Sequence, residues 1–210
     1  VYEALVGDAL LSDQIVRTVY ENLSIIPGEV NLCGAEIDLP RMEDCLHRLQ
    51  GALHSVRMAN VYDIIMIDCP PSLGSLTLNA FVASDSLVVP IQCEYYALEG
   101  LSALVNTISR ISSVLNPNLQ IEGLLRTMYD PRNSLTLDVS AQLSAHFGDK
   151  LYQTVIPRNV RLAEAPSFGM PALAYDKQSR GAVAYLALAG EVVRRSKQAA
   201  KAAAVTDLND

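Results

Sequence analysis

The chain has 210 residues, of which half are hydrophobic and 19% are charged. This composition is typical of a folded globular domain and excludes an intrinsically disordered chain. The formal net charge of −7 argues against a protein that coats nucleic acid over its whole surface. The longest apolar run, Ala182 to Gly190, is well below the ~18 residues that cross a bilayer, so we expect no membrane span.

Charges and cysteines narrow the class of protein further. Residues 1–110 hold 14 acids and 5 bases, whereas residues 111–210 hold 9 acids and 11 bases. This asymmetry indicates one basic face, and chance scatter explains it equally well. The four cysteines lie far apart without a CxxC pair, which favours reduced thiols over a disulfide framework or a zinc site.

Short apolar runs alternate with segments of helical period along the first half of the chain. The runs LSIIPG, YDIIMID and SLVVPI are apolar nearly throughout, which indicates buried strands. Between the first two, apolar residues recur on one helical stripe. The pattern therefore predicts strands at 23–28, 62–68 and 86–91, and helices at 41–60 and 75–83.

The same alternation continues in the second half. The pattern predicts helices at 97–115, 134–147 and 179–201, and strands at 120–128 and 150–157. Strands that alternate with helices in this way indicate an α/β protein, with a parallel sheet covered by helices on both faces. We see no linker in the sequence and expect a single domain over residues 1–210.

The strand expected at 62–68 ends on a carboxylate, Asp68. In an open parallel sheet, ligands bind in the crevice beyond the carboxyl ends of the strands. A carboxylate there is well placed to hold a hydrated magnesium ion, directly or through a water, in a phosphate site. A helix cap or an ion pair with a base accounts for Asp68 equally well.

A second strand end is a candidate for binding a planar base. The strand at 150–157 leads into a loop, Pro157 to Asn159. Proline fixes the backbone there, and free main-chain groups can read the edge of a base without a dedicated side chain. Taken alone, this signal is weak.

Four long phrases of the sequence resemble the ParA/Soj branch of chromosome- and plasmid-partitioning ATPases. They are IIMIDCPPSLGSLTLNAF, PIQCEYYALEGLSALVNTI, MYDPRNSL and VIPRNVRLAEAPSFGMPALAYDKQSRGAVAYLALAGEV, in the order in which the family has them. The resemblance covers nearly the whole chain. It implies a P-loop NTPase-type parallel sheet with helices on both faces, forming one ParA-type nucleotide-binding domain over residues 1–210.

The resemblance also implies cofactors, partners and roles for individual residues. The family binds ATP and Mg²⁺ and dimerises around the nucleotide, and Asp68 would be the Walker B acid that supports magnesium and catalysis. Pro157 and Asn159 would flank the adenine, and Arg132 and Arg161 match positions that hold nonspecific double-stranded DNA. The resemblance further implies a ParB-type centromere-binding partner and a cytoplasmic, nucleoid-associated protein.

One part of the family pattern is missing from these residues. The family's first βαβ unit carries the glycine loop KGGVGKTT and a following DxDPQ acid, and neither occurs here; no Gly-Lys-Ser/Thr triplet exists in the sequence. We therefore interpret the chain as an N-terminally truncated ATPase. The complete chain would hydrolyse ATP, whereas these residues alone are expected to be inactive.

Two alternatives stay open at this point. A MinD-like ATPase that positions cell division has the same fold, but it needs an amphipathic membrane helix with bulky apolar residues, which the Ala-rich tail lacks. A nonenzymatic scaffold that has kept the fold and lost the P-loop would give the same residues. Only the sequence upstream of Val1 separates such a scaffold from a truncated enzyme.

Overall fold

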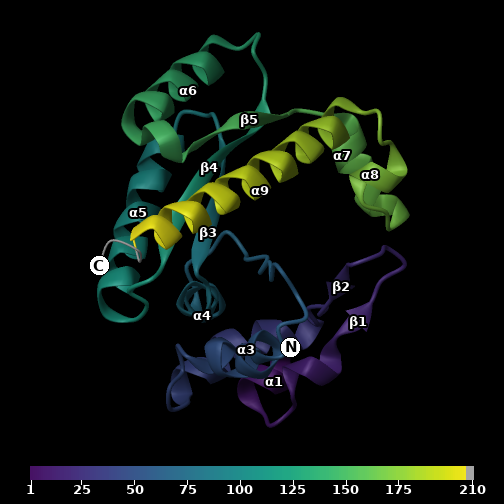
Figure 1. Cartoon of the computed structure of the whole chain (residues 1–210), viewed down its shortest axis with the longest axis vertical. Coiled ribbons are helices and arrows are strands. Elements are labelled where there is room, and N and C mark those ends of the chain that lie inside the picture. Colours follow the sequence, from purple (N-terminus) through teal and green to yellow (C-terminus); the bar gives the residue numbers. More distant parts are fainter. Residues whose placement is uncertain (207–210) are drawn as a thin grey trace. The chain divides into compact units, whose positions relative to one another are not determined.

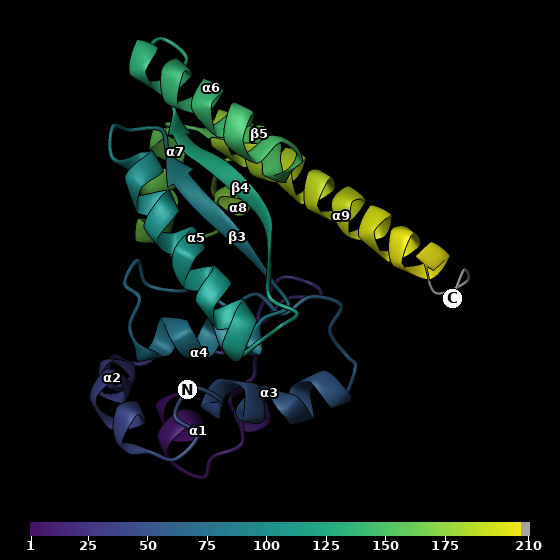
Figure 2. The same ribbon diagram turned by 90° about the vertical axis from the view of Figure 1, so that its left-hand side faces the viewer.

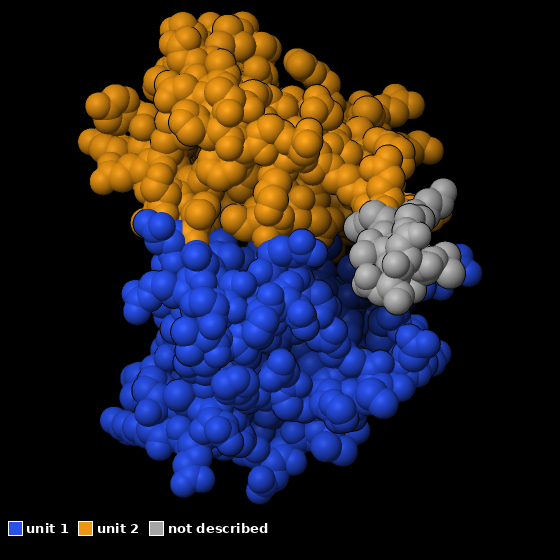
Figure 3. Space-filling model, turned by 60° about the vertical axis from the view of Figure 1, so that its left-hand side comes forward, with its two compact units in different colours: residues 1–87, 106–120 blue, residues 88–105, 121–210 orange. Residues whose placement is uncertain are grey.

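The computed structural model describes the backbone of residues 1–206 and the side chains of residues 1–198. The described chain divides into two compact units, residues 1–87 with 106–120 and residues 88–105 with the described residues from 121 onward (Figure 3). The expectation of a single domain stays a prediction. None of the described helices combines the length and the hydropathy needed to cross a membrane. The prediction that the Ala-rich tail lacks the bulky apolar residues of a membrane helix concerns residues 199–210. The side chains of these residues lie outside the described part of the structure.

The first unit consists mainly of helices (Figure 1). Its α-helices are α1 (Tyr2–Val6), α2 (Ala35–Asp38), α3 (Arg48–Met58) and α4 (Ser75–Ala83), and its short 3-10 helices are η1 (Leu11–Gln14), η2 (Val30–Gly34) and η3 (Leu39–Arg41). The strands β1 (Val16–Arg17) and β2 (Ser24–Ile25) pair in antiparallel orientation. The strand predicted at 23–28 is thus present, but short.

Buried apolar side chains hold these helices together. Leu5, Ala35 and Leu39 form one cluster, and a second cluster joins α1, η1, α3 and α4. Helix α3 begins at Arg48, although the sequence predicts a helix from residue 41. The reason is local, because Asp44 has a φ of 53°, which a right-handed helix cannot accommodate.

The prediction of a strand at 62–68 is wrong in this structure. Residues 64–70 have neither helix nor strand (Figure 1). The side chains of Ile64, Ile65 and Met66 are 64%, 42% and 87% exposed. A strand is stabilised by ladder hydrogen bonds to a neighbour. Among the strands in the described part of the chain, none pairs with this segment, so its apolar run remains irregular.

The parallel sheet contains β3 (Ser86–Gln92), β4 (Gln120–Tyr129) and β5 (Leu151–Pro157) in the order β3-β4-β5, and β4 and β5 are parallel. The accompanying α-helices are α5 (Ala97–Val114), α6 (Ser134–Phe147), α7 (Val160–Glu164), α8 (Ala172–Tyr175) and α9 (Arg180–Thr206). Two 3-10 helices, η4 (Gly148–Lys150) and η5 (Ala165–Phe168), join them. The elements predicted for the second half are confirmed, with small shifts at their ends.

Helices cover both faces of the sheet in the second unit. Leu125 of β4 packs in a cluster with Tyr152 and with apolar residues of α9, which runs along one side of the strands (Figure 2). The next residue, Arg126, points to the opposite face and donates to Ser140 Oγ of α6 at 2.8 Å. Successive residues of a strand face opposite sides, so α9 and α6 lie on different faces. This confirms the α/β arrangement expected from the sequence.

Strand β5 bulges beside α9. Leu124 and Arg126 of β4 pair with Leu151 and Val155 of β5, so β5 contains two more residues than its partner over this stretch. The bulge frees the amide N–H groups of Gln153 and Thr154 from the ladder. Both donate to the carboxylate of Glu191 on α9, each at 2.9 Å.

Candidate functional site

A cavity of about 210 Å³ lies at the carboxyl ends of β3, β4 and β5. It is lined by residues that end these strands or follow them: Gln92, Cys93, Glu94, Met128, Asp130, Asn133, Thr136 and Arg158. This is the place where open parallel sheets bind their ligands. Sites for whole ligands typically measure about 300–1,000 Å³, so this cavity has room for part of a nucleotide rather than all of it.

One residue of the loop predicted to lie beside a base, Arg158, lines this cavity. Pro157 ends β5, and the backbone N–H of Arg158 donates to Tyr129 O at 3.3 Å. Asn159 caps α7, because its Oδ1 accepts from the Arg161 amide at 3.0 Å. Pro157 and Asn159 are the neighbours of Arg158 in the chain and are not among the residues that line the cavity. The role of Pro157 and Asn159 in holding adenine stays a prediction.

Asp130 and Arg132 form a forked ion pair at the cavity. Arg132 donates through Nε to Asp130 Oδ1 at 2.9 Å and through Nη2 to Oδ2 at 2.8 Å. Its backbone N–H adds a third bond to Oδ1 at 3.0 Å. The side-chain and backbone hydrogen bonds from Arg132 lower the pKa of Asp130 to about 2. Arg132, predicted to bind DNA, is thus 87% exposed but already has an acidic partner.

The second arginine predicted to bind DNA is paired in the same way. Arg161 Nη1 donates to Glu164 Oε2 at 2.8 Å, and its Nε lies 3.5 Å from Asp176 Oδ2. The hydrogen bond and charge of Glu164 raise the pKa of Arg161. Both arginines are therefore present as exposed cations whose charge nearby carboxylates offset, and the prediction that they hold DNA stays untested.

Asp68 belongs to the first unit and lies exposed in the irregular segment. Burial, with a smaller effect from the neighbouring Asp68 charge, raises the pKa of the Cys69 thiol. No group of three or more His, Cys, Asp or Glu side chains within the described residues is placed to hold a metal. Magnesium often takes only one or two carboxylates, with phosphates and waters completing its shell. An exposed Asp68 fits that chemistry, and its role stays a prediction.

Several residues of the cavity were not predicted individually from the sequence. Glu94, Asp130 and Arg158 lie just after β3, β4 and β5 respectively. Asp130 and Arg158 directly follow an apolar strand and Glu94 follows one residue later, so all three lie where parallel sheets bind ligands. The sequence therefore contained the information needed to predict these residues, because the strands that precede them were predicted and are confirmed.

Comparison with known proteins places these observations in context. Residues 1–121 match a family model described as an AAA domain. The chromosome partitioning protein ParA of Caulobacter vibrioides is 49% identical over 203 residues, which cover 96% of this chain and 76% of that protein. The sporulation initiation inhibitor protein Soj of Bacillus subtilis is 54% identical over 192 residues, which cover 91% and 75% of the two chains.

A solved structure is similar to this chain in fold. The crystal structure of cobyrinic acid a,c-diamide synthase from Mycobacterium smegmatis with bound ADP and magnesium superimposes with a TM-score of 0.76 at 33% identity. The match covers 93% of this chain and 72% of that one. The P-loop NTPase-type fold predicted from the sequence is confirmed.

Proposed function

This chain belongs to the ParA/Soj family of chromosome-partitioning ATPases, and we propose that it acts in ATP-dependent segregation of chromosome or plasmid DNA. The observation that supports nucleotide binding is the cavity at the carboxyl ends of β3, β4 and β5. Its position agrees with the site at which parallel α/β sheets bind nucleotides. Its size suits a base better than a whole nucleotide.

We propose separate roles for residues of the two units. Pro157 and Asn159 would hold the adenine next to Arg158, on a loop that proline and the α7 cap keep rigid. Asp68 would hold a hydrated Mg²⁺ ion through a water. When bound, Mg²⁺ neutralises phosphate charge. The residues given contain no Gly-Lys-Ser/Thr triplet, so we propose hydrolysis for the full-length protein and not for these residues alone.

DNA binding is the second part of the proposal. Arg132 and Arg161 are exposed and carry carboxylate partners, and we propose that phosphates of nonspecific double-stranded DNA take the place of these acids. Such contacts fix a protein on the duplex without reading its sequence. In this proposal the protein forms a homodimer on ATP, responds to a ParB-type centromere-binding partner, and works in the cytoplasm on the nucleoid.

The test is ATP binding and hydrolysis by the purified full-length protein, with and without magnesium and duplex DNA. We expect magnesium-dependent release of phosphate, and DNA binding that appears only with ATP. A full-length protein that binds neither ATP nor DNA would overturn the proposal. Binding of ATP without any hydrolysis would instead support a scaffold that has kept the fold.

A further inference from the structure

The first turn of α4 is capped by a residue from another helix. The N-cap residue of α4 is Gly74, which has no side chain to accept its amide hydrogens. The first N–H groups of any helix lack partners within the helix. Here Glu36 of α2 provides them, because its carboxylate accepts from Ser75 N at 2.7 Å and from Leu76 N at 3.2 Å.

Gly74 makes this contact possible. A Cβ atom at position 74 would lie 2.5 Å from Glu36 Oε2, closer than real Cβ atoms approach an oxygen. The φ of Gly74 is −81°, which any residue can adopt. A side chain at this position would therefore displace the Glu36 carboxylate, whereas the backbone conformation itself does not require glycine.

The body of α4 is anchored separately. Asn79 is fully buried and its side chain bonds to Cys45 O at 2.8 Å and to Leu49 N at 3.1 Å, which ties α4 to the start of α3. Thr77 Oγ1 donates to Ser72 O at 2.7 Å. With α4 fixed in this way, the Glu36 contact and the Thr77 bond hold the end of the loop that begins after Asp68.

We propose that Glu36 is a positioning residue for the phosphate site of this ATPase, a role that rests on the proposed function. The loop from Asp68 to Gly74 is only a few residues long, and Pro70 and Pro71 restrict its φ angles. Fixing its far end at Gly74 therefore limits where Asp68 can lie. Glu36 would act on Asp68 through this loop, without touching the nucleotide.

The experiment compares full-length wild-type protein with Glu36→Ala and Glu36→Gln. Glutamine keeps one acceptor oxygen but loses the charge that makes such hydrogen bonds about twice as strong, so it should restore part of the function. Glu43→Ala is the matched control, since Glu43 is an exposed glutamate of the same unit. Amide hydrogen exchange of residues 72–78, kcat, and the Kd for ATP are measured for each protein, together with thermal unfolding.

We expect faster exchange at Ser75 and Leu76 and a kcat lowered about tenfold or more in Glu36→Ala, with a Kd for ATP changed by less than about threefold. Glu36→Gln should be intermediate and Glu43→Ala unchanged. Faster exchange with unchanged kcat would overturn the positioning role and leave Glu36 as a helix cap. Unchanged exchange would overturn the contact itself. Wild-type protein without hydrolysis would overturn the proposed function and the positioning role together, while the exchange data would still report on the Glu36 contact.

Discussion

Glu191 and Arg195 lie one turn apart on α9 and together clamp the bulge of β5. Arg195 Nη2 donates to Glu191 Oε1 at 2.9 Å and to Leu151 O at 2.7 Å. Its Nη1 donates to Asp149 O at 2.9 Å. Glu191 is 6% exposed, so a buried carboxylate and a partly buried guanidinium fix the longest helix to the sheet.

The first prediction concerns the pH dependence of this clamp. Burial by itself would raise the pKa of Glu191, but hydrogen bonds from the Thr154 and Gln153 amides and from Arg195 outweigh burial and lower it to about 2. Because the folded-state pKa is depressed, the carboxylate stabilises fully above its ordinary pKa of 4.5 and loses this effect as the pH falls towards 2. Glu191→Gln should lower the free energy of unfolding by roughly 2 kcal/mol at neutral pH.

Urea unfolding at about pH 7, 5 and 3 measures this prediction. The difference between wild type and Glu191→Gln should shrink at the lowest pH, because the carboxyl of the unfolded chain, with its ordinary pKa of 4.5, is then protonated while the folded carboxylate stays largely ionised. Glu99→Gln, an exposed position on α5, should stay within about 0.5 kcal/mol of wild type throughout. An equal loss at every pH would show that the Glu191 pKa is not depressed.

The second prediction concerns the close approach of β4 and Tyr152. A Cβ at Gly123 would lie 2.3 Å from the Tyr152 ring, whereas a Cβ at Gly100 of α5 meets nothing within 4 Å. Gly123→Ala should destabilise the protein by about 1–3 kcal/mol through overpacking. Gly100→Ala, the matched control, should stabilise it by about 0.5–1 kcal/mol because alanine favours a helix interior. Thermal unfolding of the two variants and of wild type measures these changes in stability. A Gly123→Ala protein as stable as wild type would mean that β4 and Tyr152 move apart easily.

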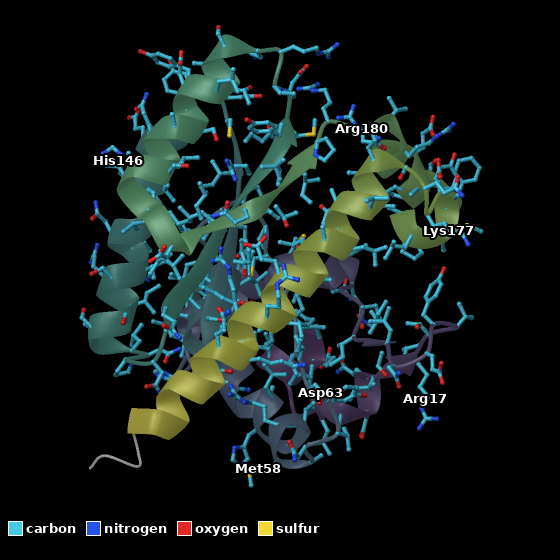
Figure 4. All side chains as sticks on the ribbon, turned by 45° about the horizontal axis from the view of Figure 1, so that its top comes forward. Arg17, Met58, Asp63, His146, Lys177 and Arg180 are labelled. Carbon is cyan, nitrogen blue, oxygen red and sulfur yellow. The ribbon has the colours of Figure 1, made fainter. Side chains whose placement is uncertain are left out.

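The third prediction concerns Asp68. In the full-length protein, Asp68→Ala should abolish magnesium-dependent ATP turnover, because the carboxylate organises the ion that offsets phosphate charge. Its unfolding should be unchanged, since Asp68 is exposed. Asp63→Ala is the control, an exposed acid that precedes the same apolar run (Figure 4). Turnover is measured by phosphate release, and full activity of Asp68→Ala would remove this residue from the site.

The fourth prediction concerns the paired arginines. Losing one phosphate contact should reduce the salt slope of log K for duplex DNA by about 0.9, so Arg132→Ala and Arg161→Ala should each weaken binding of any sequence. Glu164→Gln should strengthen it, because it removes the carboxylate 2.8 Å from Arg161. Arg17→Ala serves as control, since Arg17 is an exposed arginine in the first unit (Figure 4).

Binding is followed by fluorescence anisotropy over a range of salt concentrations, with ATP present. If Arg132→Ala and Arg161→Ala leave both affinity and slope unchanged, DNA binds elsewhere, for example at Arg194 or Lys197. A Glu164→Gln protein that binds DNA no more tightly than wild type would show that the acid does not compete with phosphate.

The sequence predicted those elements whose partners lie in the described structure. The helix expected at 97–115 is α5, Ala97–Val114, and the strand at 150–157 is β5, Leu151–Pro157. The apolar run at 62–68 has an equally strong pattern, yet no strand pairs with it here. The pattern of apolar residues in a sequence indicates which side chains a strand would bury. The strand forms only if its backbone can hydrogen-bond to a neighbouring strand.

The candidate site was predicted at the level of strand ends but not at that of individual contacts. The rule for parallel sheets identified the loop Pro157 to Asn159, of which Arg158 lines the cavity, and the structure adds Asp130. The ion pair of Arg161 with Asp176 was not predicted from the sequence. These two residues are far apart in the chain, and only the fold brings them together.

The bulge of β5 has a consequence for the end of the sheet. β5 is the last strand in the order β3-β4-β5, and such outer strands can recruit strands from other molecules. At Gln153 and Thr154, however, the amide hydrogens are already bound by Glu191. These two amides are therefore not available to pair with a strand from another molecule, in a stretch whose register is already irregular. The hydrogen bonds from β5 to Glu191 that hold α9 therefore also disfavour the addition of a strand from another molecule to β5.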